Sequence, residues 1–242
     1  MRTFLASFAL ALLCAAGAAQ AGTGYYLVTV YEQEGERAVD FRFWSVHTAS
    51  GATISSPELG VSWSPTREWY ANVRAIGLHT SFSGNQFLGI GLQNDFLLTH
   101  GQYPFDLAIH TDLTHFRDGA NGNEIEFGPV LQTEYGRTQI NANVLFSRSY
   151  SVPQPEPLEM QYQWQARYRF SQAAQFGLQG FGELGKWNDW DPQRLQSHRI
   201  GPVFAGEAPA GKHAWKYEFA YFIGKVRASP AKTFSMRIQA TF

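Results

Sequence analysis

Residues 233–242, which read TFSMRIQATF, decide the fold of this chain. Phe234 and every second residue after it are apolar, and the residues between them, including Arg237 and Gln239, are polar. Successive side chains of a β-strand point to opposite faces, so this alternation predicts a strand with one apolar and one polar face. The apolar face ends on Phe242, whereas a soluble domain more often ends in a polar tail.

The same alternation recurs along the chain and predicts an all-β, antiparallel protein. The clearest segments are 38–46, 58–64, 69–76, 104–114, 161–170 and 214–223. Less regular segments lie at 86–97, 124–134, 138–148, 174–185 and 197–206. We expect about twelve strands, within a range of roughly ten to fourteen, each near the length that a tilted membrane strand needs.

The composition of the polar faces favours a membrane barrel over a soluble sandwich. In residues 161–170 the polar positions hold Gln, Gln, Gln, Arg and Arg, and Lys is scarce in the other segments. A soluble β-domain would expose Lys and Glu there, whereas a lumen wall would not need them. Aromatic residues near strand ends predict interfacial girdles, namely Trp63, Trp69, Tyr70, Trp215 and Tyr217. A soluble periplasmic β-domain remains the alternative.

The connections between the segments alternate in length. Tight turns are expected at 64–67, 135–137 and 171–173, and longer links at 48–57, 117–123, 149–157 and 186–196. With the terminal aromatic residue, this pattern resembles the Gram-negative outer-membrane β-barrel proteins over residues 38–242. The resemblance implies an up-and-down transmembrane β-barrel in the cell outer membrane, contact with membrane lipid, and assembly by the barrel-insertion machinery with Phe242 as its signal.

The N-terminal residues predict export. Arg2, the apolar run 4–18 and the small residues around 19–21 fit a signal peptide over residues 1–21 that is cleaved before Gly22. The single Cys, Cys14, lies within it, so the exported chain would use no disulfide. Residues 22–37 form a lead-in with an apolar patch, either a strand or a plug.

Charge and length exclude some classes of protein. The chain has 19 Lys and Arg against 20 Asp and Glu, without a basic patch for nucleic acid. No apolar run after residue 21 approaches the ~18 residues of a transmembrane helix. The length fits one domain.

Asp106, His110 and Asp112 form the first candidate site. Their even spacing places all three on the inward face of one strand. Such a row predicts either a proton relay or weak metal site, or a hydrogen-bond network of the lumen; we favour the network and expect no metal or cofactor.

A set of arginines on polar faces forms the second candidate, listed as Arg42, Arg74, Arg167, Arg169 and Arg237. They could bind anionic solutes, or pair with lumen carboxylates and narrow the pore. The acidic candidates are Asp40, Glu58, Glu124, Glu126, Glu183 and Glu218. The near balance of positive and negative residues in the chain favours pairing of these arginines with the carboxylates.

Function remains open at this point. No Ser-His-acid arrangement, G-x-S-x-G elbow or H-E-x-x-H motif stands out, so no catalytic residue is assigned. The two Trp and two Asp of residues 187–192 lack the spacing of a calcium loop. We expect a small channel or facilitator for small polar or anionic solutes. The alternatives are a lipid-modifying enzyme of the outer membrane and a structural or adhesin-like barrel with a filled lumen.

Overall fold

The computed structural model describes residues 24–30, 34–81, 83–154, 156–211 and 213–242. The expected signal peptide, residues 1–21, lies outside the described residues, as does part of the lead-in. No helix in these ranges is long and apolar enough to cross a membrane.

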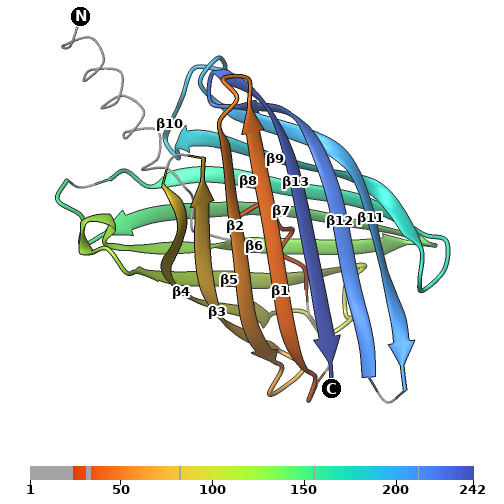
Figure 1. Ribbon diagram of the computed structural model, residues 1–242. Helices are drawn as coiled ribbons and strands as arrows, with labels where there is room; N and C mark the ends of the chain where they lie inside the picture. The colour runs from red at the N-terminus through yellow and green to blue at the C-terminus, as the bar shows by residue number, and fades with distance from the viewer. Residues whose placement is uncertain (1–23, 31–33, 82, 155, 212) are drawn as a thin grey trace, which may run out of the picture.

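Antiparallel strands make up nearly all of the described chain (Figure 1). They are β1 (Arg37–Thr48), β2 (Thr53–Trp63), β3 (Trp69–Thr80), β4 (Gly84–Leu97), β5 (Phe105–Phe116), β6 (Asn123–Tyr135), β7 (Thr138–Tyr150), β8 (Glu159–Arg169), β9 (Gln175–Lys186), β10 (Asp189–Trp190), β11 (Ser197–Ala210), β12 (His213–Val226) and β13 (Ser229–Thr241). A short 3-10 helix, η1 (Gly119–Asn121), lies between β5 and β6.

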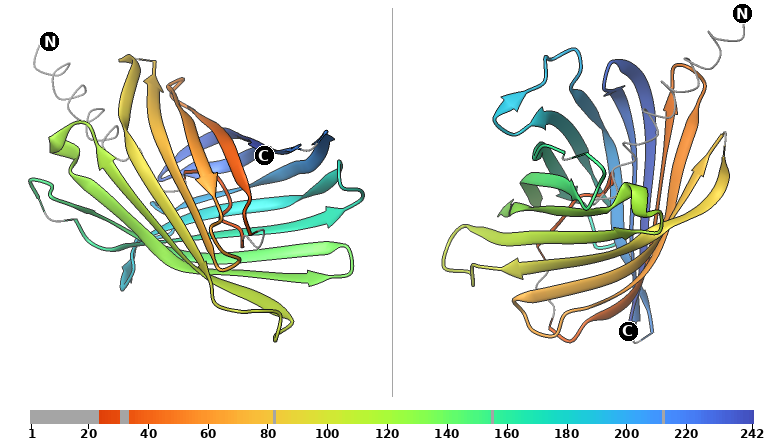
Figure 2. Two further views of the ribbon diagram at one scale, coloured as in Figure 1. Left: turned by 90° about the horizontal axis from the view of Figure 1, so that it is seen from below. Right: turned by 90° about the vertical axis from the view of Figure 1, so that its left-hand side faces the viewer.

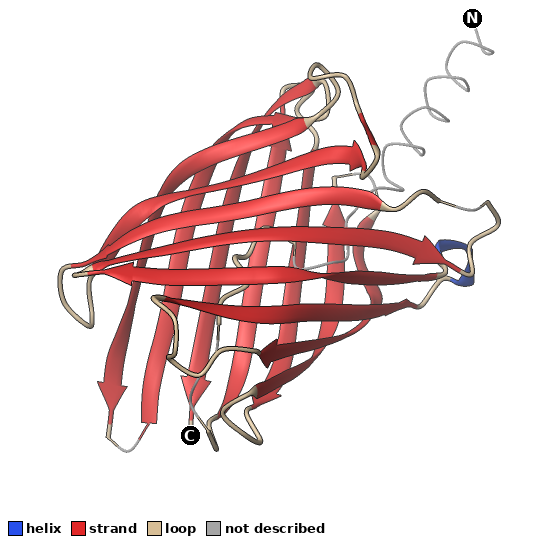
Figure 3. Cartoon of the chain, turned by 180° about the vertical axis from the view of Figure 1, so that it is seen from behind, coloured by secondary structure: helices blue, strands red, loops and turns tan. Residues whose placement is uncertain are grey.

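The sheet closes on itself because β13 pairs with β1. Each strand pairs with its neighbours in sequence, with one exception at β10. The strand β9 pairs with the short β10 and also with β11. In the part of the chain that the structure describes, twelve strands therefore form one up-and-down barrel, as the alternation predicted (Figures 2 and 3). Closure leaves none of the twelve described barrel strands at an open edge, as a membrane barrel requires.

The two faces of each strand show which way the apolar side chains point. On β2 the apolar Leu59 and Val61 are 58% and 54% exposed. Glu58, the residue before Leu59 on the same strand, is only 4% exposed. On β13, Phe234 is exposed while Gln239 is buried inside the barrel. A soluble core would have the opposite arrangement. The apolar faces therefore form an outer band suited to lipid, and the polar faces line the interior.

The two ends of the barrel differ. One end, called the terminus end, holds the start of β1 and the end of β13. There the main-chain N–H of Phe242 donates to the carbonyl of Arg37 at 2.8 Å. At the other, the loop end, lie the connections after β1, β3, β5, β7, β9 and β12. The expected alternation of lengths is weaker than predicted. Residues 53–57 belong to β2, which shortens the expected long link at 48–57, and β12 and β13 are joined by a tight turn.

An aromatic belt surrounds the terminus end. The ring of Trp69 lies 6.4 Å from that of Trp63 and stacks on Phe96 at 6.2 Å, and Trp215 is exposed on β12. The prediction for Tyr70 is wrong, because its hydroxyl lies inside the barrel, 3.2 Å from Nη2 of Arg237. Tyr70 shares the sequence parity of the inward Arg74 and not that of the outward apolar residues.

Candidate functional site in the lumen

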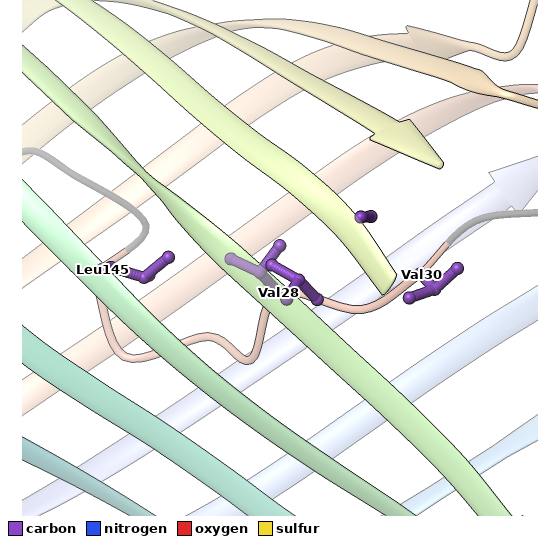
Figure 4. Close-up of a cluster of buried hydrophobic side chains, with 5 residues drawn as sticks. Val28, Val30 and Leu145 are labelled. Atoms are coloured by element: carbon purple, nitrogen blue, oxygen red, sulfur yellow. The ribbon is translucent and has the colours of Figure 1, made fainter. Parts of the chain in front are cut away.

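Residues 24–30, called the lumen segment below, cross the inside of the barrel (Figure 2). Val28 and Val30 pack against the inward-facing Ala108, Val130 and Leu145 of β5, β6 and β7 (Figure 4). The apolar patch seen in the lead-in sequence therefore meets an apolar patch of the lumen wall. This contact places the segment across the lumen.

Hydrogen bonds from wall amides hold the same segment. The N–H of Val28 donates to Oε1 of Gln163 at 3.0 Å, and its carbonyl accepts from Nδ2 of Asn143 at 2.8 Å. Gln163 and Asn143 are also joined to each other at 3.0 Å. Wall amides thus pair the Val28 backbone as a neighbouring strand would.

Aromatic contacts hold the other end of the lumen segment. Tyr25 makes edge contacts with Trp44 at 5.0 Å and Phe181 at 6.3 Å, and the guanidinium of Arg199 lies 4.0 Å from its ring centroid. A cation over an aromatic face is attracted by the ring quadrupole. The interior is therefore less uniformly polar than the sequence predicted, because aromatic residues of β1 and β9 face inward here.

The first group of wall charges is centred on Asp40. Its carboxylate pairs with Arg42 at 2.9 Å and with Arg237 at 2.8 Å, and Arg42 also donates to Gln93 at 3.0 Å. Asp40 is 1% exposed. Two of the predicted arginines therefore share one buried carboxylate.

Arg74 forms a second group. Its guanidinium lies between Glu58 on β2, at 2.9 Å, and Asp112 on β5, at 2.6 Å. All three side chains are buried. Removing charges from water is costly, so each of the two buried carboxylates depends on its contact with the guanidinium.

The predicted row Asp106, His110 and Asp112 faces inward, but its members do not act together. His110 contacts Asp95 at 2.5 Å and Glu126 at 3.3 Å on the adjacent strands, while Asp112 contacts Arg74. Asp106 accepts from Thr99. Cross-strand neighbours are closer than residues two apart on one strand, which explains the partners of His110. Arg74 on β3 reaches Asp112 on β5 across Gly91 of β4. In the described ranges, no cluster of His, Cys, Asp and Glu suits a metal ion.

The remaining candidates lie on β8, β9 and β12. Arg167 is 3.4 Å from Glu218, and Arg169 pairs with Glu134. Glu183 pairs with Arg199, which the sequence reading missed because alternation in β11 is less regular. Asp95 was also missed, although its parity with Gln93 on β4 marked it as inward.

A cavity of about 250 Å³ remains between the lumen segment and the wall toward the terminus end. Leu27 and Thr29 line one side of it, and Arg167, Glu218 and Arg237 the other. The remaining lining is mostly Gln, Lys and small residues. This space can hold several water molecules or one small solute.

The loop with two Trp and two Asp is a hairpin whose side chains are exposed. Asp189 and Trp190 form β10 against Lys186 and Gly185, and Asp191 donates its N–H to the carbonyl of Leu184 at 2.8 Å. Backbone hydrogen bonds to β9 therefore position this segment.

The closed barrel with an apolar outer band and a polar lumen is a transmembrane β-barrel of the Gram-negative outer-membrane type. Among solved structures, an outer membrane channel from Pseudomonas putida F1 aligns with 90% of this chain and 100% of its own, at a TM-score of 0.60 and 10% identity. The CymD monoaromatic hydrocarbon channel aligns over 86% and 88%, at a TM-score of 0.47 and 8% identity. No family model matches the sequence, and neither does any curated protein. The likeness to the first of these structures supports the fold.

Proposed function

We propose that this protein is an outer-membrane channel for small polar solutes, closed in this conformation by the lumen segment. The observation that carries the proposal is the polar cavity beside residues 24–30. This cavity is already an open part of the lumen. Moving the segment aside would join this cavity to the rest of the interior.

Paired charges favour small polar solutes over anions. Arg42 and Arg237 share Asp40, Arg74 lies between two carboxylates, and Arg167 faces Glu218. These groups together hold four arginines and four carboxylates, so they supply no net positive potential, which selective anion passage needs along its path.

The energies of the lumen segment support a displaceable closure. Four buried side chains and the two Val28 hydrogen bonds contribute about 10 kcal/mol, at roughly 2 and 1 kcal/mol each. Ordering the backbone of seven residues costs about 10 kcal/mol, at roughly 1.5 kcal/mol each. Because the two contributions nearly cancel, a modest perturbation would shift the segment out of the lumen.

Planar-bilayer conductance tests this proposal. The protein lacking residues 24–30 should conduct continuously, and the full protein should conduct less or only in brief openings. Heat-modifiable migration on gels provides the control that both barrels are folded. If neither protein conducts above the bare bilayer, the channel proposal fails.

A filled-lumen structural barrel is the second candidate, and the Arg74 group favours it. A guanidinium buried between two carboxylates obstructs its side of the lumen permanently. The same conductance experiment separates the candidates, because a structural barrel stays closed after the segment is removed.

The alternative of a lipid-modifying enzyme receives less support. Outward-facing His47 and His115 bond to Thr53 at 3.0 Å and to Asn123 at 2.6 Å, so their Nδ1 atoms contact neutral partners. A hydrolytic triad would need a carboxylate to orient the imidazole.

We also propose that Phe242 is the signal read by the barrel-insertion machinery. Its side chain is exposed at the end of the closing strand, where a partner could bind it before the barrel closes.

A further inference from the structure

Basic and imidazole side chains gather on the outer face of the barrel at the loop end. They lie near the ends of their strands and alternate with inward neighbours, such as Val46 and Thr233, that are buried. The set is His47, His79, His115, Arg148, His198, Lys225 and Lys232.

Four of these residues are contiguous and are called the basic arc: His198, Lys225, Lys232 and His47. The register pairs His198 with Lys225 across β11 and β12, and Lys232 with His47 across β13 and β1. Lys232 also pairs with Ile223, two residues from Lys225, so the two lysines are diagonal neighbours. With adjacent strands about 4.8 Å apart, the arc spans about 15 Å of the barrel wall.

The described outward positions around this charge carry no carboxylate; Glu183, which interacts electrostatically with His198, is on the inward face of β9. The outward positions of the twelve barrel strands, all within the described ranges, hold no Asp or Glu. The ammonium of Lys225 donates to the carbonyl of Gln193, and His47 bonds through Nδ1 to Thr53. On the inward face, by contrast, arginines such as Arg74 and Arg167 pair with carboxylates.

The arc lies at the edge of the apolar band. Ten residues separate the level of Arg37 at the terminus end from that of His47. At about 3.3 Å per residue and a tilt of about 40°, this corresponds to about 25 Å, the height of the apolar band of outer-membrane barrels. Below Lys232 the outward residues of β13 are Phe234, Met236 and Ile238. The basic arc therefore lies at head-group level at the loop end of the barrel.

We propose that the basic arc binds the phosphate groups of a lipid in the leaflet at the loop end. This inference rests on the membrane placement in the proposed function, but not on conduction. Lysines at an anionic membrane surface gain about 1 kcal/mol each, and Nε2 of His47 adds an N–H donor for a phosphate oxygen. The ring nitrogens of His198 bond to Tyr162 and Gln196, so this member of the arc does not donate to phosphate. Two diagonal lysines, roughly 7–8 Å apart at the backbone, suit a lipid with more than one phosphate.

Native mass spectrometry of the purified full chain in detergent tests this proposal, with lipid A as the probe and enzymatically dephosphorylated lipid A as the comparison. The wild type should retain lipid A and release the dephosphorylated form. The variant Lys225→Gln/Lys232→Gln should bind lipid A roughly ten- to thirty-fold more weakly, as expected for two interfacial lysines. The control Arg37→Gln/Arg67→Gln removes two exposed charges at the terminus end and should bind like the wild type.

Several outcomes would overturn the proposal: equal retention of both lipids, equal weakening by the control, or an unaffected arc variant. Displacement of lipid A by an equal concentration of inorganic phosphate would also contradict it. If the double variant does not fold, Lys232→Gln alone and the salt dependence of wild-type binding provide the test, since screening should weaken the complex. The arc variant should keep wild-type conductance, so failure here is distinct from failure of the channel proposal.

Discussion

The side-chain amide of Asn143 donates a hydrogen bond of 2.8 Å to the main-chain carbonyl of Val28. This bond ties the lumen segment to β7, and the neighbouring Gln163 completes the attachment through the N–H of the same residue. The two contacts show how a non-strand segment satisfies its backbone inside a barrel, which buried peptide groups require.

Replacing Asn143 with Ala should open the channel more often. The carbonyl of Val28 would lose its partner, which costs about 1–3 kcal/mol and disfavours the closed position of the segment. We expect the open probability in planar bilayers to rise about tenfold. Asn141→Ala is the matched control, because Asn141 is two residues away on the same face and bonds only wall amides. Equal effects of both variants would show that general loosening, and not the Val28 contact, controls opening.

Arg74→Met should destabilise the barrel by about 3–5 kcal/mol, because Glu58 and Asp112 would remain buried without their cation. Urea titration of the refolded protein, followed by tryptophan fluorescence, measures the loss. Arg169→Gln should change stability by less than about 1 kcal/mol, since its pair with Glu134 is partly exposed. An unfolding free energy for Arg74→Met equal to that of the wild type would contradict the assignment of this group as a structural support.

Glu218→Gln should shift ion selectivity toward anions. It leaves Arg167, 3.4 Å away on the cavity wall, without its carboxylate. Arg167→Gln should shift selectivity in the opposite direction. The reversal potential under a salt gradient gives both signs, measured in the protein that lacks residues 24–30. Identical reversal potentials in the two variants would place the conducting path away from this cavity.

Phe242→Ala should slow assembly without weakening the finished barrel. The hydrogen bond to Arg37 uses the main-chain N–H of residue 242, so it survives the substitution. Insertion into membranes that contain the purified insertion machinery should fall several-fold. Thermal unfolding of the assembled barrel should remain unchanged. Normal insertion would remove the proposed signal role of the side chain.

Sequence alone identified the barrel because lipid and lumen impose a period of two on each strand. The alternation of Phe234, Met236 and Ile238 with Arg237 and Gln239 could be read without knowing any neighbour. It also placed Asp106, His110 and Asp112 on the inward face, and the even strand count followed from counting such segments. The roles proposed for the lumen residues in solute passage stay predictions.

Only the tertiary structure decided which residues meet. Arg74 finds Glu58 on the adjacent strand and Asp112 two strands away, and His110 finds Asp95, because strand register sets these contacts and register cannot be read from one strand. The same holds for Val28, which lies more than one hundred residues from Asn143. Alternation is a local consequence of backbone geometry, whereas pairing depends on closure of the whole barrel.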